Sequence, residues 1–111
     1  MTVWYHVRDL DAAREFYKEK LGFTEMQVDF DERWSRLERG VMEIGLAEGE
    51  PQPDGGVAHV DVDDVKAERE RLQSEGVQVG IVLELHGNVR LLEVFDPDGN
   101  RVELAQELPG G

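Results

Sequence analysis

The sequence predicts an α+β fold built from two tandem β-α-β-β-β modules. Apolar residues change from strand spacing to helix spacing and back in the same order in each half of the chain. A segment with two prolines and three glycines, residues 49–56, separates the halves. We therefore expect one domain over residues 1–111, with module one at 1–48, a linker at 49–56 and module two at 57–107.

Module one begins with a strand, because residues 2–7 (TVWYHV) are rich in β-branched and aromatic side chains. A helix follows, with Asp9 or Asp11 as its N-cap and Gly22 just past its end. The helix carries an apolar stripe at helical spacing, formed by Leu10, Ala13, Phe16, Tyr17 and Leu21. Three short strands complete the module, at residues 23–30, 33–39 and 41–48.

Module two repeats this order. Residues 57–62 form a strand, Asp63 or Asp64 caps the next helix, and Gly76 ends it. Further strands are expected at residues 77–82, 89–95 and 101–106. A turn at Asp96-Pro97-Asp98-Gly99 joins the last two.

The two halves also match residue by residue. The run Val7-Arg8-Asp9-Leu10 corresponds to Val62-Asp63-Asp64-Val65 at an offset of 55. Gly22 meets Gly76 after the loss of one residue. A match in both order and sequence is typical of a duplicated unit.

The composition excludes several classes of function. With 25 Asp and Glu against 12 Lys and Arg, the net charge is −13, so we expect no nucleic-acid partner. No apolar run approaches the ~20 residues of a membrane span, so we expect no membrane partner either. The chain has no cysteine, which excludes thiol catalysis and fits a cytoplasmic location.

Strand alternation predicts which side chains face away from the helices. That face collects two carboxylates, two imidazoles, a further aspartate and an indole, on Glu43, Glu103, His6, His59, Asp61 and Trp4. Carboxylates and imidazoles on one surface can bind Zn, Ni, Mn or Fe. We expect Trp4, Trp34 and Phe95 to form the base of a ligand pocket, where their rings can stack on a ligand. His86 lies in a predicted loop, residues 84–88, as a further candidate contact.

Three stretches resemble the signatures of the vicinal oxygen chelate superfamily, at residues 9–23 (DLDAAREFYKEKLGF), 56–72 (GVAHVDVDDVKAERERL) and 94–106 (VFDPDGNRVELAQ). That superfamily includes glyoxalase I, bleomycin-resistance proteins, fosfomycin-resistance enzymes and extradiol dioxygenases. The resemblance implies that the two modules form a cupped mixed sheet, paired in a homodimer. It does not select one chemistry, since one fold hosts many functions.

The resemblance also implies four metal-ligand positions, one on the first and one on the last strand of each module. Glu43 and Glu103 fall on the two last-strand positions, whereas Thr2 and Val57 fall on the first-strand positions and are not usual ligands. His59 lies on the same face, roughly 6.5 Å further along its strand. One divalent ion (Zn, Ni, Mn or Fe) would therefore bind Glu43, His59 and Glu103.

Two functions follow from these residues. The favoured one is a metal-free protein that sequesters a small molecule, as bleomycin-resistance proteins do, with a cationic ligand suited to the net charge. Its predicted contacts are Trp4, His6, Trp34, His59, Asp61 and Phe95. The alternative is a metal-dependent lyase, isomerase or dioxygenase with Glu43 and Glu103 as catalytic residues. A regulatory domain that binds a metabolite without turnover is the third hypothesis.

Overall fold

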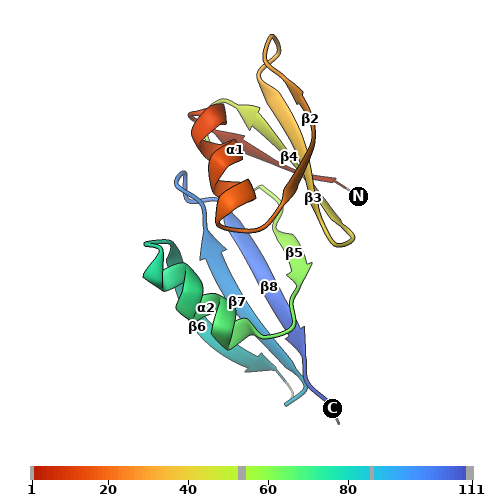
Figure 1. The fold of residues 1–111 in the computed structure, drawn as a ribbon, viewed down its shortest axis with the longest axis vertical. Coiled ribbons are helices and arrows are strands. Elements are labelled where there is room, and N and C mark those ends of the chain that lie inside the picture. The colour runs from red at the N-terminus through yellow and green to blue at the C-terminus, as the bar shows by residue number, and fades with distance from the viewer. Residues whose placement is uncertain (1, 53–54, 86, 110–111) are drawn as a thin grey trace.

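The computed structural model describes residues 2–52, 55–85 and 87–109 and contains two four-stranded mixed sheets (Figure 1). The first sheet has the order β1-β4-β3-β2 and the second β5-β8-β7-β6. Each sheet belongs to one β-α-β-β-β module, so the predicted fold is confirmed. In the part of the chain that is described, no helix is long and apolar enough to cross a membrane.

Module one consists of β1 (Thr2–Val7), α1 (Leu10–Glu19), β2 (Thr24–Asp29), β3 (Trp34–Arg39) and β4 (Met42–Glu48). β1 pairs in parallel with β4, and β3 pairs antiparallel with both β4 and β2. Asp9, rather than Asp11, is the N-cap of α1, because its side chain accepts a hydrogen bond from the Ala12 amide.

Module two consists of β5 (Ala58–Asp61), α2 (Val65–Ser74), β6 (Gln78–Leu85), β7 (Val89–Phe95) and β8 (Arg101–Glu107). Asp64 caps α2 by accepting from the Ala67 amide, which decides between Asp63 and Asp64. The pairing repeats that of module one, with β5 parallel to β8 and β7 antiparallel to both β8 and β6.

The prediction of a loop at residues 84–88 is partly wrong. β6 continues to Leu85, because Leu83 and Leu85 pair across the sheet with Leu91 and Val89. A shift of register between Val79 and Val82 bends the strand before this pairing. His86, the candidate contact in that loop, lies outside the described residues.

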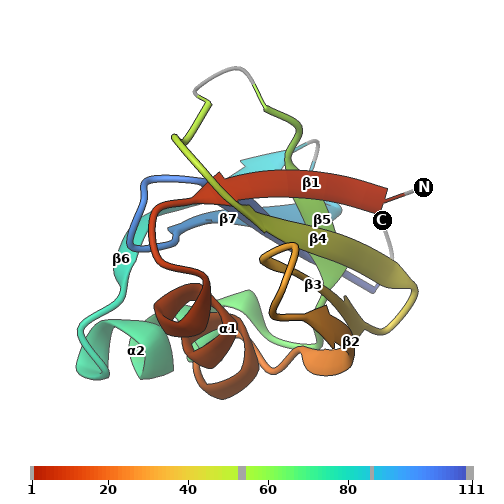
Figure 2. The same cartoon turned by 90° about the horizontal axis from the view of Figure 1, so that it is seen from above.

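Both helices cover the same side of the two sheets (Figure 2). Side chains of the strands alternate accordingly: Tyr5, Ile44 and Val60 are buried under the helices, whereas Trp4 and His59 are exposed on the opposite side. We call this uncovered side of both sheets the open face. The strand faces predicted from alternation are therefore confirmed.

A buried polar cluster joins the modules at the β7–β8 turn. The Tyr17 hydroxyl on α1 donates to Asp96 Oδ2 at 2.8 Å, and Asn100 Nδ2 donates to the same oxygen and to the His6 carbonyl of β1. Asp96 and Asn100 are both buried. Burial raises the pKa of Asp96 above its usual range, although four hydrogen bonds favour its charged form.

Tyr5 makes a second bridge between the modules. Its hydroxyl donates to the Arg101 carbonyl at 2.5 Å and accepts from the Ala58 amide at 2.7 Å. Burial raises the pKa of Tyr5 to about 12, so the phenol stays protonated and able to donate. The ring of Tyr5 stacks on that of Tyr17, with centroids 6.1 Å apart. The relative position of the two open-face halves is thus fixed from beneath.

Candidate functional site

The open face of module one presents two tryptophans and a carboxylate. Trp4 on β1 is 45% exposed, and its ring meets that of Trp34 on β3 edge to face, with centroids 6.2 Å apart. Glu43 on β4 accepts a hydrogen bond from the Thr2 hydroxyl at 2.9 Å and lies 3.8 Å from Arg36 Nε. Three of the predicted site residues are therefore brought to one sheet. An indole left this exposed can stack on a ligand ring.

His6, the fourth predicted residue on this sheet, is half-buried at the end of β1 nearest the linker. It and Trp34 pair with opposite sides of the same β4 residue, Ala47. Its backbone carbonyl is held by Asn100 at 3.0 Å. His6 thus borders the tryptophan pair while its strand is fixed by the module junction.

The open face of module two presents an imidazole between two carboxylates. His59 Nδ1 lies 3.5 Å from Glu103 Oε1, and His59 Nε2 lies 3.8 Å from Asp61 Oδ1. The His59 side chain is 53% exposed, so these contacts are screened by water. Beside them, Arg101 donates to Glu93 at 2.8 Å. The second half of the open face is consequently polar and mostly acidic.

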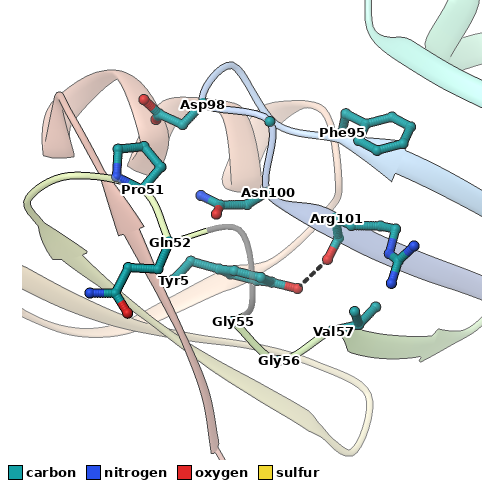
Figure 3. Close-up of a pocket in the computed structure, with 11 residues that line it drawn as sticks. Tyr5, Pro51, Gln52, Gly55, Gly56, Val57, Phe95, Asp98, Asn100 and Arg101 are labelled. Atoms are coloured by element: carbon teal, nitrogen blue, oxygen red, sulfur yellow. Dashed lines mark hydrogen bonds between the residues drawn. The ribbon is translucent and has the colours of Figure 1, made fainter.

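Phe95 lies at a different place, in a cavity of about 330 Å³ at the module junction (Figure 3). The cavity is bordered by Tyr5, by linker residues such as Pro51 and Gln52, and by the β7–β8 turn. The aromatic pair on the first sheet consists of Trp4 and Trp34 without Phe95. The three aromatics predicted to floor one pocket therefore do not form one described cluster.

Residues 2–104 match the family model of the glyoxalase/bleomycin resistance protein/dioxygenase superfamily. The chain belongs to this superfamily. The match covers both modules and confirms the resemblance stated above. No curated protein sequence matches the chain significantly.

Solved structures of several superfamily members and similar proteins share this fold. An integron cassette protein from the mobile metagenome of the Halifax Harbour sewage outfall is 23% identical, with a TM-score of 0.83 and 96% of each chain covered. The bleomycin-binding protein of Streptomyces verticillus, solved with copper(II)-bleomycin, is 23% identical with a TM-score of 0.74, covering 97% of this chain and 95% of that one. The lactoylglutathione lyase of Agrobacterium tumefaciens is 21% identical with a TM-score of 0.74, covering 96% and 91%. At these identities the likeness concerns the fold alone.

Among the residues that the structure describes, one chain does not assemble the metal-ligand set predicted from the sequence. His59 and Glu103 are neighbours on the second sheet, but Glu43 belongs to the first. Across the described ranges, no three His, Asp or Glu side chains are grouped so that they could hold a metal ion. The donors present in one described chain therefore do not fit the predicted three-ligand site.

The strand register also shows how Glu43 and Glu103 are placed in their own modules. The α1 amide of Leu10 is held by Glu48 Oε2 at 3.1 Å, and the equivalent α2 amide of Val65 by Gln106 Oε1 at 2.9 Å. Glu48 and Gln106 thus occupy the same place in the two modules, 58 residues apart (106 − 48). By that offset Glu103 corresponds to Gly45, and Glu43 to Arg101. The two glutamates are therefore not at equivalent positions.

Gly45 and Arg36 are open-face residues for which no role was predicted. They pair with each other across β3 and β4, and Gly45 pairs with Trp4 on its other side. The alternation that placed Trp34 next to Arg36 on one strand could have identified the arginine. Nothing local to Gly45 could have shown that an indole covers it, because Trp4 is 41 residues away in sequence.

Proposed function

We propose that the protein binds and sequesters a small cationic molecule on its open face without a metal. The observation that carries this proposal is the exposed indole of Trp4, which meets the half-buried Trp34 edge to face on the same sheet as Glu43. Aromatic faces attract both flat apolar groups and cations, so the pair suits a ligand with either character. The bleomycin-binding protein of Streptomyces verticillus has the same fold, which supports a binding role for this chain.

The charge of the molecule supports a cationic ligand. The net charge is −13, and the open face carries Glu43 on the first sheet and Asp61 and Glu103 beside the imidazole of His59 on the second. A surface of one sign concentrates solutes of the other sign and speeds their association. The basic groups on this face, Arg36 and Arg101, are each within salt-bridge distance of a glutamate.

We further propose that two copies pair so that the open face of each module adjoins a module of the other copy. Two exposed leucines on one face of β6 support this pairing: Leu83 and Leu85 remain 43% and 42% exposed. Monomeric proteins seldom leave adjacent large apolar side chains uncovered without a partner or ligand. Sedimentation at micromolar concentration that shows only monomer would remove this part of the proposal.

A metal-dependent lyase, isomerase or dioxygenase is the second candidate function. The pairing of His59 with Glu103 favours it, and the lactoylglutathione lyase of Agrobacterium tumefaciens shares the fold. The separation of Glu43 from this pair counts against it within one chain.

A thermal-shift screen of cationic, neutral and anionic small molecules tests the proposed function. A ligand present at 100 times its Kd stabilises a protein by about 2.7 kcal/mol, which is readily measured. We expect cations to raise Tm, in protein treated with a chelator as well as untreated, and the shift to shrink as salt rises above about 0.15 M. Glu43→Gln should weaken cation binding up to about fivefold, whereas Glu19→Gln on the helix side should not.

The same screen separates the two candidates. Binding that requires added Zn, Ni, Mn or Fe and disappears in Glu103→Ala would support the metal-dependent enzyme. A preference for anions over cations would contradict the proposed function directly.

A further inference from the structure

The indole of Trp4 lies directly on the backbone of Gly45, its pairing partner on β4. A Cβ added to Gly45 would lie 2.3, 2.4 and 2.5 Å from Cε3, Cδ2 and Cζ3 of Trp4. These distances are nearly equal, so the face of the benzo ring covers Gly45, since an in-plane approach to Cε3 would leave the other two atoms much farther away. Position 45 therefore has no room for a side chain while the indole lies flat.

The ring of Trp34 packs against the indole in this position. Trp34 pairs with Ala47 on β4, and its ring meets Trp4 at an interplanar angle of 73°. One face of Trp4 rests on Gly45, and the residue stays 45% exposed to solvent. A ring held in advance loses little conformational entropy when a ligand stacks on it.

In module two, the position equivalent to Gly45 has a side chain. The register that equates Glu48 with Gln106 equates Gly45 with Glu103, and Trp4 with His59. One copy of the duplicated position therefore pairs a glycine with an indole, and the other pairs a glutamate with an imidazole. The two halves of the open face offer different chemistry, a flat π surface on one sheet and negative charge on the other.

We infer that Gly45 sets the ligand class of the open face, selecting planar aromatic cations whose ring system stacks on Trp4. This inference rests on the proposed binding function and goes beyond it, because a cation could also bind by charge alone. Gly45 acts as a positioning residue through Trp4 and need not touch the ligand. Any side chain at position 45 tilts the indole off the sheet and removes the flat surface.

Two cations that differ in shape test the inference by titration calorimetry, planar 9-aminoacridine and globular 1-adamantanamine. We expect the wild-type protein to bind the planar cation about tenfold more tightly, the gain typical of an aromatic contact. Gly45→Ala should lose that preference and keep the weaker affinity for the globular cation. Gly80→Ala is the matched control, because a Cβ there meets Glu93 Cβ at an ordinary 3.6 Å and the glycine is also in a strand.

The position of the indole can be followed without any ligand. Both tryptophans of the chain belong to this pair, so Trp34→Phe leaves Trp4 as the single tryptophan. In that background we expect Gly45→Ala to shift the emission of Trp4 to longer wavelength, and Gly80→Ala to leave it unchanged. A double-mutant cycle with Trp4→Leu should show that the loss of stability from Gly45→Ala largely disappears once the indole is gone.

The outcomes distinguish the inference from the proposed function. Equal affinity for the two cations, or a planar preference that survives Gly45→Ala, overturns the inference and leaves the binding function standing. Binding of neither cation overturns both. If Gly45→Ala fails to fold, Trp4→Leu alone decides: an unchanged planar preference overturns the inference, and its loss supports it.

Discussion

At the level of single residues, the surroundings of two carboxyl groups shift their pKa values in opposite directions. Glu25 on β2 accepts two hydrogen bonds from Arg14 on α1, at 2.6 and 2.7 Å, and a third from the Ser35 hydroxyl. The Arg14 hydrogen bonds lower the pKa of Glu25 to about 2. Asp96 also accepts several hydrogen bonds, but burial at the module junction dominates there and raises its pKa.

The Glu25 shift predicts a pH dependence of stability. Because the folded pKa lies below the unfolded value of 4.5, the contribution of Glu25 is fully present above pH 4.5 and is lost as pH falls toward 2. We expect Glu25→Gln to lower the free energy of unfolding by about 1–2 kcal/mol at pH 6, with the deficit shrinking at pH 3. Urea denaturation at both values, with exposed Glu32→Gln as control, measures this. A deficit that is the same at pH 6 and pH 3 would contradict it.

At the scale of elements, local signals in the sequence predicted most of the fold. The sequence predicted two candidate N-cap aspartates for each helix, and in the structure the N-caps are Asp9 and Asp64. The alternation of strands correctly separated Tyr5 from Trp4 and Val60 from His59. These features depend on neighbouring residues, which is why a single sequence contains them.

The register between strands that are distant in the chain could not be predicted from the sequence. Glu43 and Glu103 both follow one apolar residue in the last strand of a module, and locally they look equivalent. Their parallel partners, Thr2 and His59, lie about 40 residues away and are chosen by how the whole module packs. The same limit hid the contact of Trp4 with Gly45, which decides the shape of the candidate site.

At the scale of the molecule, the junction between modules governs the geometry of the site. The chain is elongated, 49 × 28 × 25 Å, and each module supplies a different half of the open face. The β7–β8 turn holds β1 and α1 of module one through Asp96 and Asn100. The relative position of the two halves of the open face therefore depends on a few buried polar contacts beneath it.

We expect Asp96→Ala to destabilise the protein by about 2–4 kcal/mol, because buried donors on Tyr17 and Asn100 lose their acceptor. Asp98→Ala in the same turn is the comparison: it removes hydrogen bonds from the Arg8 amide and guanidinium but leaves no buried donor of Tyr17 or Asn100 without an acceptor, so it should cost only about 1 kcal/mol. Chemical denaturation measures both. Hydrogen exchange should show faster exchange of the Ala58 amide in Asp96→Ala than in Asp98→Ala. Equal stability of the two variants would show that the cluster does not join the modules.

The proposed function requires the exposed indole of Trp4 to contact the bound small molecule. Titration calorimetry of the best cation from the screen should therefore compare wild-type protein with Trp4→Ala and Phe30→Ala. Phe30 is the matched control, because it is an aromatic of module one that is 55% exposed. We expect a loss of affinity of about tenfold in Trp4→Ala and little change in Phe30→Ala. Equal affinity in all three proteins would contradict it and place the ligand elsewhere.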